Sequence, residues 1–238
     1  MSNGPANQRD ERGRSGRPSA DPATRLWLCE TLWRLGGVQF GDFSLGRTVR
    51  HSPVYLNPKL LISRPETLQR VAQLIESEVQ LALAMRNQPI APFDVIAGVP
   101  IGGLHVATAL SLQMRVPLLY ARPDTSPDEH DRPHIEGVYR PGQQALIVDD
   151  LAAGGGSLVD TALRLRRAGL FVRDAVVLVD REQGARRRLE AIGARLHPML
   201  TLDVLVTYLH EAGHISDDDY RNSMQYLDRE GEARSEFD

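Results

Sequence analysis

The sequence predicts an α/β fold in which a mostly parallel sheet is flanked by helices. Short apolar segments, too continuous for amphipathic surface helices, are typical of strands buried on both faces. Helical patterns follow most of these segments, and two of the segments run directly into glycine-rich turns. The strands are expected at residues 94–97, 117–120, 145–148 and 175–179.

The chain before this sheet predicts an N-terminal hood made of a helix and a hairpin. Residues 1–22 are polar and rich in Arg, Gly, Ser and Pro, a composition that predicts a disordered arm. A helix is expected from Pro22 to a glycine pair, and a hairpin from two β-rich segments around Phe43 and residues 54–56. A long amphipathic helix then begins at Pro65, where proline costs a helix least.

One domain, residues 23–215, accounts for the apolar patterns, and an acidic C-terminal extension, residues 216–238, follows it. With 238 residues and 42% hydrophobic content, the chain is long enough to bury a full core. In the extension we expect a short helix around residues 220–227. Its Met224 and Leu227 would dock on the domain or on a partner.

Composition excludes several classes of function. The net charge of −3 provides no basic field for nucleic acid, and no segment approaches the roughly 20 apolar residues of a membrane span. We therefore expect neither nucleic acid nor membrane as a partner. The N-terminus lacks the apolar core of a signal peptide, which favours a cytoplasmic location. The single cysteine, Cys29, rules out an intramolecular disulfide and is expected to be a small buried apolar residue.

The most informative segment is residues 145–157, ALIVDDLAAGGGS. Asp149 and Asp150 follow the apolar strand, and a small-residue turn then opens a helix. That turn consists of Ala153, Gly154, Gly155, Gly156 and Ser157. Bare backbone N–H groups at a helix N-terminus suit a phosphate, and two adjacent carboxylates suit the hydroxyls of a ribose. The turn is neither a Walker A loop nor a GxGxxG motif, and a plain tight turn capped by Ser157 is the alternative.

A second glycine-rich turn follows the strand at residues 94–97. It contains Gly98, Gly102 and Gly103. Close packing of a helix on the sheet would explain these glycines equally well. Because two such turns at one sheet edge favour a ligand with two phosphorylated ends, we expect both to face the same site.

The segment with the two acids resembles the PRPP-binding signature of type I phosphoribosyltransferases, with Ala153 where the family has a hydroxyl residue. Further motifs follow the order found in orotate phosphoribosyltransferases, over roughly residues 30–215. They are FGDFSL with SPVYLNP, GVPIGG, IEGVYRPGQQALIVDDLAAGGGS, VLVDREQG and LHPMLTLDVL. The resemblance implies a type I phosphoribosyltransferase fold, transfer from PRPP to orotate or a related base, Mg²⁺ delivered with PRPP, no protein metal cluster, and a homodimer.

The same resemblance implies roles for individual residues. Asp149 and Asp150 would hold the ribose hydroxyls of PRPP, and residues 153–157 would cradle its 5′-phosphate. The turn at residues 98–103 would face the pyrophosphate. Arg181, in VLVDREQG, would contact the base together with Phe43, although a charged residue after a strand is usually a solvated helix start.

Two features differ from the family pattern and concern the charge available to the leaving pyrophosphate. The family's mobile loop is rich in lysine; here Arg122 and His130 are the matching catalytic cations, and no lysine lies between residues 121 and 137. Over residues 122–134 four acids face two arginines, a formal charge of −2. A second family lysine is replaced by Gly46, with Arg47 and Arg50 as candidate substitutes. Transfer to orotate is therefore expected to be slow or undetectable unless these arginines supply the charge, since losing such a group costs on the order of 100- to 1000-fold.

Three functional interpretations follow. The first is an orotate phosphoribosyltransferase, or a relative that acts on another base. The second is a non-catalytic protein that binds PRPP or a nucleotide as a sensor or partner. The third is an enzyme of different chemistry that holds a metal in the acidic loop, although charged runs are usually solvated. Its candidate ligands are Asp128, Glu129, His130 and His134.

Overall fold

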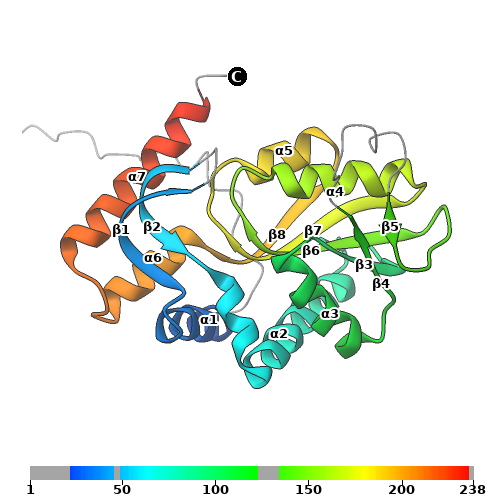
Figure 1. The fold of residues 1–238 in the computed structure, drawn as a ribbon, viewed down its shortest axis with the longest axis horizontal. Helices are drawn as coiled ribbons and strands as arrows, with labels where there is room; N and C mark the ends of the chain where they lie inside the picture. The colour runs from blue at the N-terminus through cyan, green and yellow to red at the C-terminus, as the bar shows by residue number, and fades with distance from the viewer. Residues whose placement is uncertain (1–21, 46–48, 123–133, 236–238) are drawn as a thin grey trace, which may run out of the picture.

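A six-stranded sheet forms the centre of the molecule (Figure 1). The computed structural model describes residues 22–45, 49–122 and 134–235 of the chain. The sheet strands are β3 (Val95–Gly98), β4 (Leu118–Ala121), β5 (Ile135–Glu136), β6 (Gln144–Ala152), β7 (Phe171–Asp180) and β8 (Arg195–Thr201). Their order is β5-β4-β3-β6-β7-β8, and every neighbouring pair is parallel except β4 with β5. The predicted α/β fold with a mostly parallel sheet is confirmed.

Helices cover both faces of this sheet (Figure 1). One face carries α2 (Pro65–Ala84) and α3 (Gly102–Met114), and the other carries α4 (Gly156–Arg167) and α5 (Ala185–Ala191). Alternate residues of a strand enter the two cores: Ile96 of β3 joins the α2 and α3 side, while Val95 and Ala97 join the α4 and α5 side. Because both faces are buried, the strands are apolar without alternation.

The predicted hood is present, and both ends of the chain contribute to it. Its elements are α1 (Pro22–Arg34), β1 (Val38–Leu45), β2 (Val49–Leu56), the 3₁₀ helix η1 (Pro58–Ser63), α6 (Leu202–Glu211) and α7 (Asp217–Ser235). β1 and β2 form the expected antiparallel hairpin, with Val38 opposite Leu56 and Phe43 opposite Ser52. Apolar residues of the hood belong to the same core as α2 and α3, so the hood and the sheet are packed as one unit.

The C-terminal helix α7 is much longer than the short helix expected around residues 220–227. Ser216 precedes it and accepts a hydrogen bond from the backbone N–H of Asp219 (3.1 Å), which caps the helix. Three of the acidic residues of this segment, Asp217, Asp218 and Asp219, lie in the first turn, where they complement the helix dipole. Met224 and Leu227 pack on the domain's own core, and Figure 1 shows the helix beside the hairpin.

Several predictions lie outside the described residues. They concern the arm at residues 1–21, Gly46 and Arg47 in the hairpin turn, and His130 with the acidic residues 124–131. Within the described part of the chain, no helix has both the length and the apolar content needed to cross a membrane. Cys29 is fully buried, and burial raises the pKa of its thiol to about 12, as expected for a core residue.

Candidate active site

Asp149 and Asp150 lie within the last part of β6, because this strand continues past the acids to Ala152. Their side chains are buried, with only 6% and 5% of their surfaces exposed. Burial raises the pKa of Asp149 well above its usual value, and the charge of Asp150 adds to the effect. Oδ1 of Asp149 accepts the backbone N–H of Asp150 (2.8 Å), whereas Oδ2 of Asp150 accepts no hydrogen bond from the described residues. The buried pair therefore has hydrogen-bonding capacity left for a ligand.

The start of α3 lies directly against the two acids. A Cβ on Gly102 would come within 2.3 Å of Asp150 Oδ2, and one on Gly103 within 2.6 Å of Asp149 Cα. Both glycines, predicted as part of a loop, are the first residues of α3. Gly98 is needed for helix packing, because its Cβ would lie 2.9 Å from that of Ala107. The glycines of this turn therefore let a helix N-terminus approach the carboxylates as closely as backbone allows.

The turn after β6 has the geometry of an anion cradle. Gly155 adopts a left-handed conformation (φ 78°) and packs against Ala185 of α5. No side chain caps the helix α4 that follows, so Ser157 is not a cap and the first N–H groups of α4 remain available. A Cβ on Gly156 would enter open space, whereas one on Gly154 would lie 3.8 Å from Nη1 of Arg188. The guanidinium of Arg188 therefore lies beside this turn, and no sequence motif indicated this residue.

Lys59 of η1 belongs to the site although its sequence context did not indicate it. Its Nζ lies 3.4 Å from Oδ2 of Asp150. Only its position in the sequence could have indicated a role in the site. The hairpin motif SPVYLNP ends at Pro58, and Lys59 is the next residue. The structure thus places one cation against the acid pair where sequence motifs gave none.

Arg181 follows β7 and is almost completely buried, with 1% of its surface exposed. Its Nη2 donates hydrogen bonds to Oγ of Ser52 (2.9 Å) and to the carbonyl of Val54 (3.2 Å). The guanidinium therefore joins the carboxyl edge of the sheet to the hairpin. Phe43, the other residue predicted to contact the base, is in the hairpin and stacks at a tilt on Tyr55, with ring centroids 5.6 Å apart.

Among the predicted cations of the mobile loop and hairpin turn, the structure describes side-chain contacts of Arg122. Arg122 comes directly after β4, at the same edge of the sheet, and its Nη1 lies 3.5 Å from Oε1 of Glu136. Arg50 lies at the start of β2, while Arg47 and His130 are outside the described residues. The structure thus brings together the acid pair, both glycine-rich turns and Lys59.

The segment after β7 is also held by the C-terminal helix. Nε2 of Gln183 donates a hydrogen bond to Oη of Tyr226 in α7 (2.8 Å), and both side chains are buried. Because Gln183 is two residues from Arg181, α7 stabilises the part of the chain that positions this arginine.

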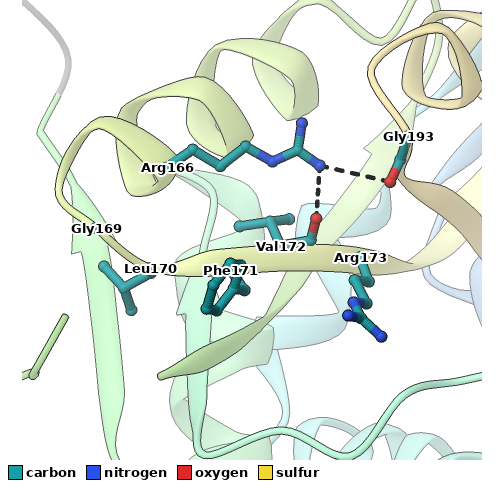
Figure 2. Close-up of a pocket in the computed structure, with 7 residues that line it drawn as sticks. All are labelled: Arg166, Gly169, Leu170, Phe171, Val172, Arg173 and Gly193. Carbon is teal, nitrogen blue, oxygen red and sulfur yellow. Dashed lines mark hydrogen bonds between the residues drawn. The ribbon is translucent and has the colours of Figure 1, made fainter. Parts of the chain in front are cut away.

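A hollow of about 450 Å³ lies at the opposite end of the sheet and is not the candidate site. Figure 2 shows Arg166 crossing it toward the carbonyls of Val172 and Gly193. The same guanidinium donates to the carbonyl of Ile192 (2.6 Å). Since backbone carbonyls take these donors, Arg166 clamps the start of β7 and is not available to bind an anion.

Comparison with known proteins identifies the family to which the chain is similar. A family model described as the phosphoribosyl transferase domain matches residues 62–192. Orotate phosphoribosyltransferase of Chlamydia caviae is 33% identical over 189 residues, 79% of this chain and 87% of that protein. Orotate phosphoribosyltransferase from Aeropyrum pernix superposes with a TM-score of 0.61 at 32% identity, over 78% of this chain and 99% of that one. UMP synthase of Leishmania donovani gives a TM-score of 0.73 at 30% identity; 86% of this chain is covered, and 42% of that longer enzyme.

Proposed function

The chain belongs to the orotate phosphoribosyltransferase family, with the type I phosphoribosyltransferase fold, and we propose that it transfers the phosphoribosyl group of PRPP to orotate. The products are orotidine 5′-monophosphate and pyrophosphate. The observation that carries this proposal is the buried pair Asp149 and Asp150, placed between the uncapped start of α4 and the glycine start of α3. Because the matched relatives are enzymes by name, a non-catalytic sensor role is not favoured.

The geometry supports a division of labour within the site. The two carboxylates accept hydrogen bonds from the ribose hydroxyls, and the N–H groups of Ala153, Gly154, Gly155, Gly156 and Ser157 cradle the 5′-phosphate. The turn of Gly98, Gly102 and Gly103 faces the pyrophosphate. Arg181 and Phe43 lie on the hairpin side, where the base enters. During transfer the bond from ribose C1 to the diphosphate breaks with its electron pair, a ring nitrogen of orotate bonds to C1, and the nitrogen's proton is released.

Mg²⁺ fits this site as a companion of PRPP. The ion prefers oxygen ligands and is usually held by one or two carboxylates together with substrate phosphates. Asp149 and Asp150 offer such oxygens, one of them without a hydrogen bond, and the described residues contain no group of three or more metal-binding side chains. When bound, Mg²⁺ would neutralise part of the charge on the diphosphate.

The test is an assay of pyrophosphate release with PRPP, Mg²⁺ and each of orotate, uracil and the purine bases. We expect release with orotate. The variant Asp149→Asn/Asp150→Asn keeps the shape of both side chains but removes their charge, and it should lose PRPP binding in a calorimetric titration. Release with another base but not with orotate, or equal binding by both proteins, would contradict the proposed function.

A further inference from the structure

Lys59 is the only lysine among the 28 lysine and arginine residues of the chain. Its Nζ lies 3.4 Å from Oδ2 of Asp150, and its side chain is 52% exposed, against 7% for the aspartate. The amine therefore reaches a buried carboxylate from the solvent side. A chain that uses arginine at every other basic position has its one lysine at the candidate active site.

The ion pair leaves the hydrogen-bonding capacity of Asp150 open. Oδ2 is buried and accepts no hydrogen bond from the described residues, although Lys59 lies within ion-pair distance. The positive charge of Lys59 also acts on Asp149, where it opposes the rise of the carboxyl pKa caused by burial. The amine thus interacts electrostatically with both acids, and no hydrogen bond fixes it to Oδ2 of Asp150.

The position of Asp150 relates Lys59 to one side of the site. Asp150 lies against Gly102, at the start of the α3 turn that faces the pyrophosphate in the proposed function. In PRPP the C2 hydroxyl and the diphosphate are attached to neighbouring carbons. An amine beside the carboxylate that holds the hydroxyls is therefore close to the diphosphate oxygens.

We propose that Lys59 is a catalytic residue whose amine contacts the diphosphate of PRPP once the ribose hydroxyls occupy Asp149 and Asp150. This inference rests on the proposed function. Lysine suits the role because its ammonium is a compact charge with three donors on a flexible stem. Arginine would tend to form a rigid two-pronged pair with the carboxylate, and so would leave it less readily.

Lys59 supplies positive charge near the pyrophosphate, where the sequence motifs carry little of it. Negative charge grows on the pyrophosphate as the bond to C1 breaks, so a cation placed there lowers the barrier. Residues 122–134 carry a formal charge of −2, and no lysine lies between residues 121 and 137. With Lys59 in this position, slow transfer is no longer the expectation.

The first experiment compares two ligands that differ in the diphosphate. Lys59→Gln is titrated with PRPP and Mg²⁺ and, separately, with ribose 5-phosphate. We expect affinity for PRPP to fall about tenfold, the loss of one charge-assisted contact, while affinity for ribose 5-phosphate is unchanged. Turnover should fall about 100-fold, and Lys59→Arg should recover part of it. Arg173→Gln, which removes an exposed positive charge at the opposite end of the sheet, is the matched control.

The second experiment uses the fact that the lysine is unique. Protein labelled with ¹⁵N-lysine should give a single side-chain ammonium signal in an NMR spectrum. This signal reports on Lys59 and does not depend on enzyme turnover. PRPP with Mg²⁺ should shift this signal more than ribose 5-phosphate does. In the ligand-free protein, Asp150→Asn should shift it as well, because the ion pair is lost.

The outcomes separate the inference from the proposed function. Equal loss of PRPP and ribose 5-phosphate binding in Lys59→Gln would mean a structural role and would overturn the inference. A signal that responds equally to PRPP and to ribose 5-phosphate would also overturn it. Failure of the wild-type protein to use orotate would remove the proposed function, while a selective effect of Lys59 on PRPP binding would still support the lysine contact.

Discussion

At the scale of single residues, the site combines two carboxylates that are costly to bury. Asp149 and Asp150 are adjacent and almost fully enclosed, and among the described residues the ion pair of this site joins Lys59 to Asp150. Such a pair favours a ligand that brings hydroxyl groups or a cation. The ligand then supplies the hydrogen-bond donors or positive charge that buried carboxylates need. Burying the two acids without a ligand lowers the free energy of unfolding, compared with the same fold carrying uncharged side chains at these positions.

The first residue-scale prediction is that Asp149→Asn stabilises the ligand-free protein at neutral and higher pH. The native pKa of Asp149 is raised by burial and by Asp150, so the folded state binds more protons than the unfolded state. Stability is therefore lost as pH rises from the unfolded value of about 4 through the raised native value. Asparagine removes this loss, and we expect a gain of about 1 to 3 kcal/mol at pH 8, the usual cost of an unsatisfied buried group.

Urea unfolding from pH 4 to pH 8 measures this effect. The difference between variant and wild type should shrink toward pH 4, where both proteins are uncharged at this position. Asp228→Asn, at an exposed position on α7, serves as control and should show no such trend. A variant that is less stable than wild type across the whole range would refute the prediction.

Residues that form local patterns could be predicted from the sequence, and residues that meet across the fold could not. The acid pair and the glycines were visible because a strand, a turn and a helix start are consecutive in the chain. Lys59 meets Asp150 only because η1 is folded back over β6 by the hairpin, and no local pattern encodes that approach. Arg181 was identified, but its bonds to Ser52 and Val54 depend on the same distant hairpin.

At the scale of elements, the central strands and helices followed from periodicity, and the C-terminal helix did not. The strands are continuous apolar runs, and α2 has a clear apolar stripe, so both patterns were readable. α7 is polar over most of its length and docks through a few side chains, including Tyr226. Its acids suggested a solvated extension, whereas three of them form a helix start.

The element-scale prediction concerns the contact of α7 with the segment after β7. Tyr226→Phe removes only the hydroxyl that accepts the Gln183 hydrogen bond, leaving a buried amide donor without this partner. We expect a loss of about 1 kcal/mol in the free energy of unfolding and a higher KM for orotate, since Gln183 is two residues from Arg181. Urea unfolding and steady-state kinetics measure the two effects.

The matched control for this contact is Tyr220→Phe on the same helix. It keeps the ring that stacks on His210, with ring centroids 4.3 Å apart, whereas the hydrogen bond from Gln183 goes to Tyr226. Its KM for orotate should equal that of the wild type. If Tyr226→Phe and Tyr220→Phe behave alike in both measurements, α7 does not position the base-binding side of the site.

At the scale of the whole molecule, the acid pair, both glycine-rich turns and Arg181 lie at the carboxyl edge of one mostly parallel sheet. Parallel strands end at the same edge, so the acid pair after β6, the glycine start of α3 after β3 and Arg181 after β7 converge without special loops. The hood closes this edge with segments from both ends of the chain (Figure 1). Four predicted strands and the glycine-rich turns after two of them indicated the same arrangement, so the fold class could be inferred from the sequence.

The last prediction is that the protein is a homodimer in solution. It rests on the resemblance to the family, which placed the hairpin around Phe43 and the loop at residues 122–134 near the partner. The described surface also carries exposed apolar side chains on α2 and α3, two helices that pack together: Leu81 is 58% and Leu112 is 77% exposed. Covering such residues is a common contribution of a symmetric interface, although single exposed apolar residues are frequent in monomers.

Light scattering at micromolar concentration should give about twice the 26.4 kDa of one chain. Leu112→Glu should lower this mass if α3 lies in the interface, while Phe171→Glu, on the first residue of β7 and 58% exposed, should not. A wild-type mass of one chain would exclude the dimer, and a dimer unaffected by Leu112→Glu would direct the interface to the hairpin.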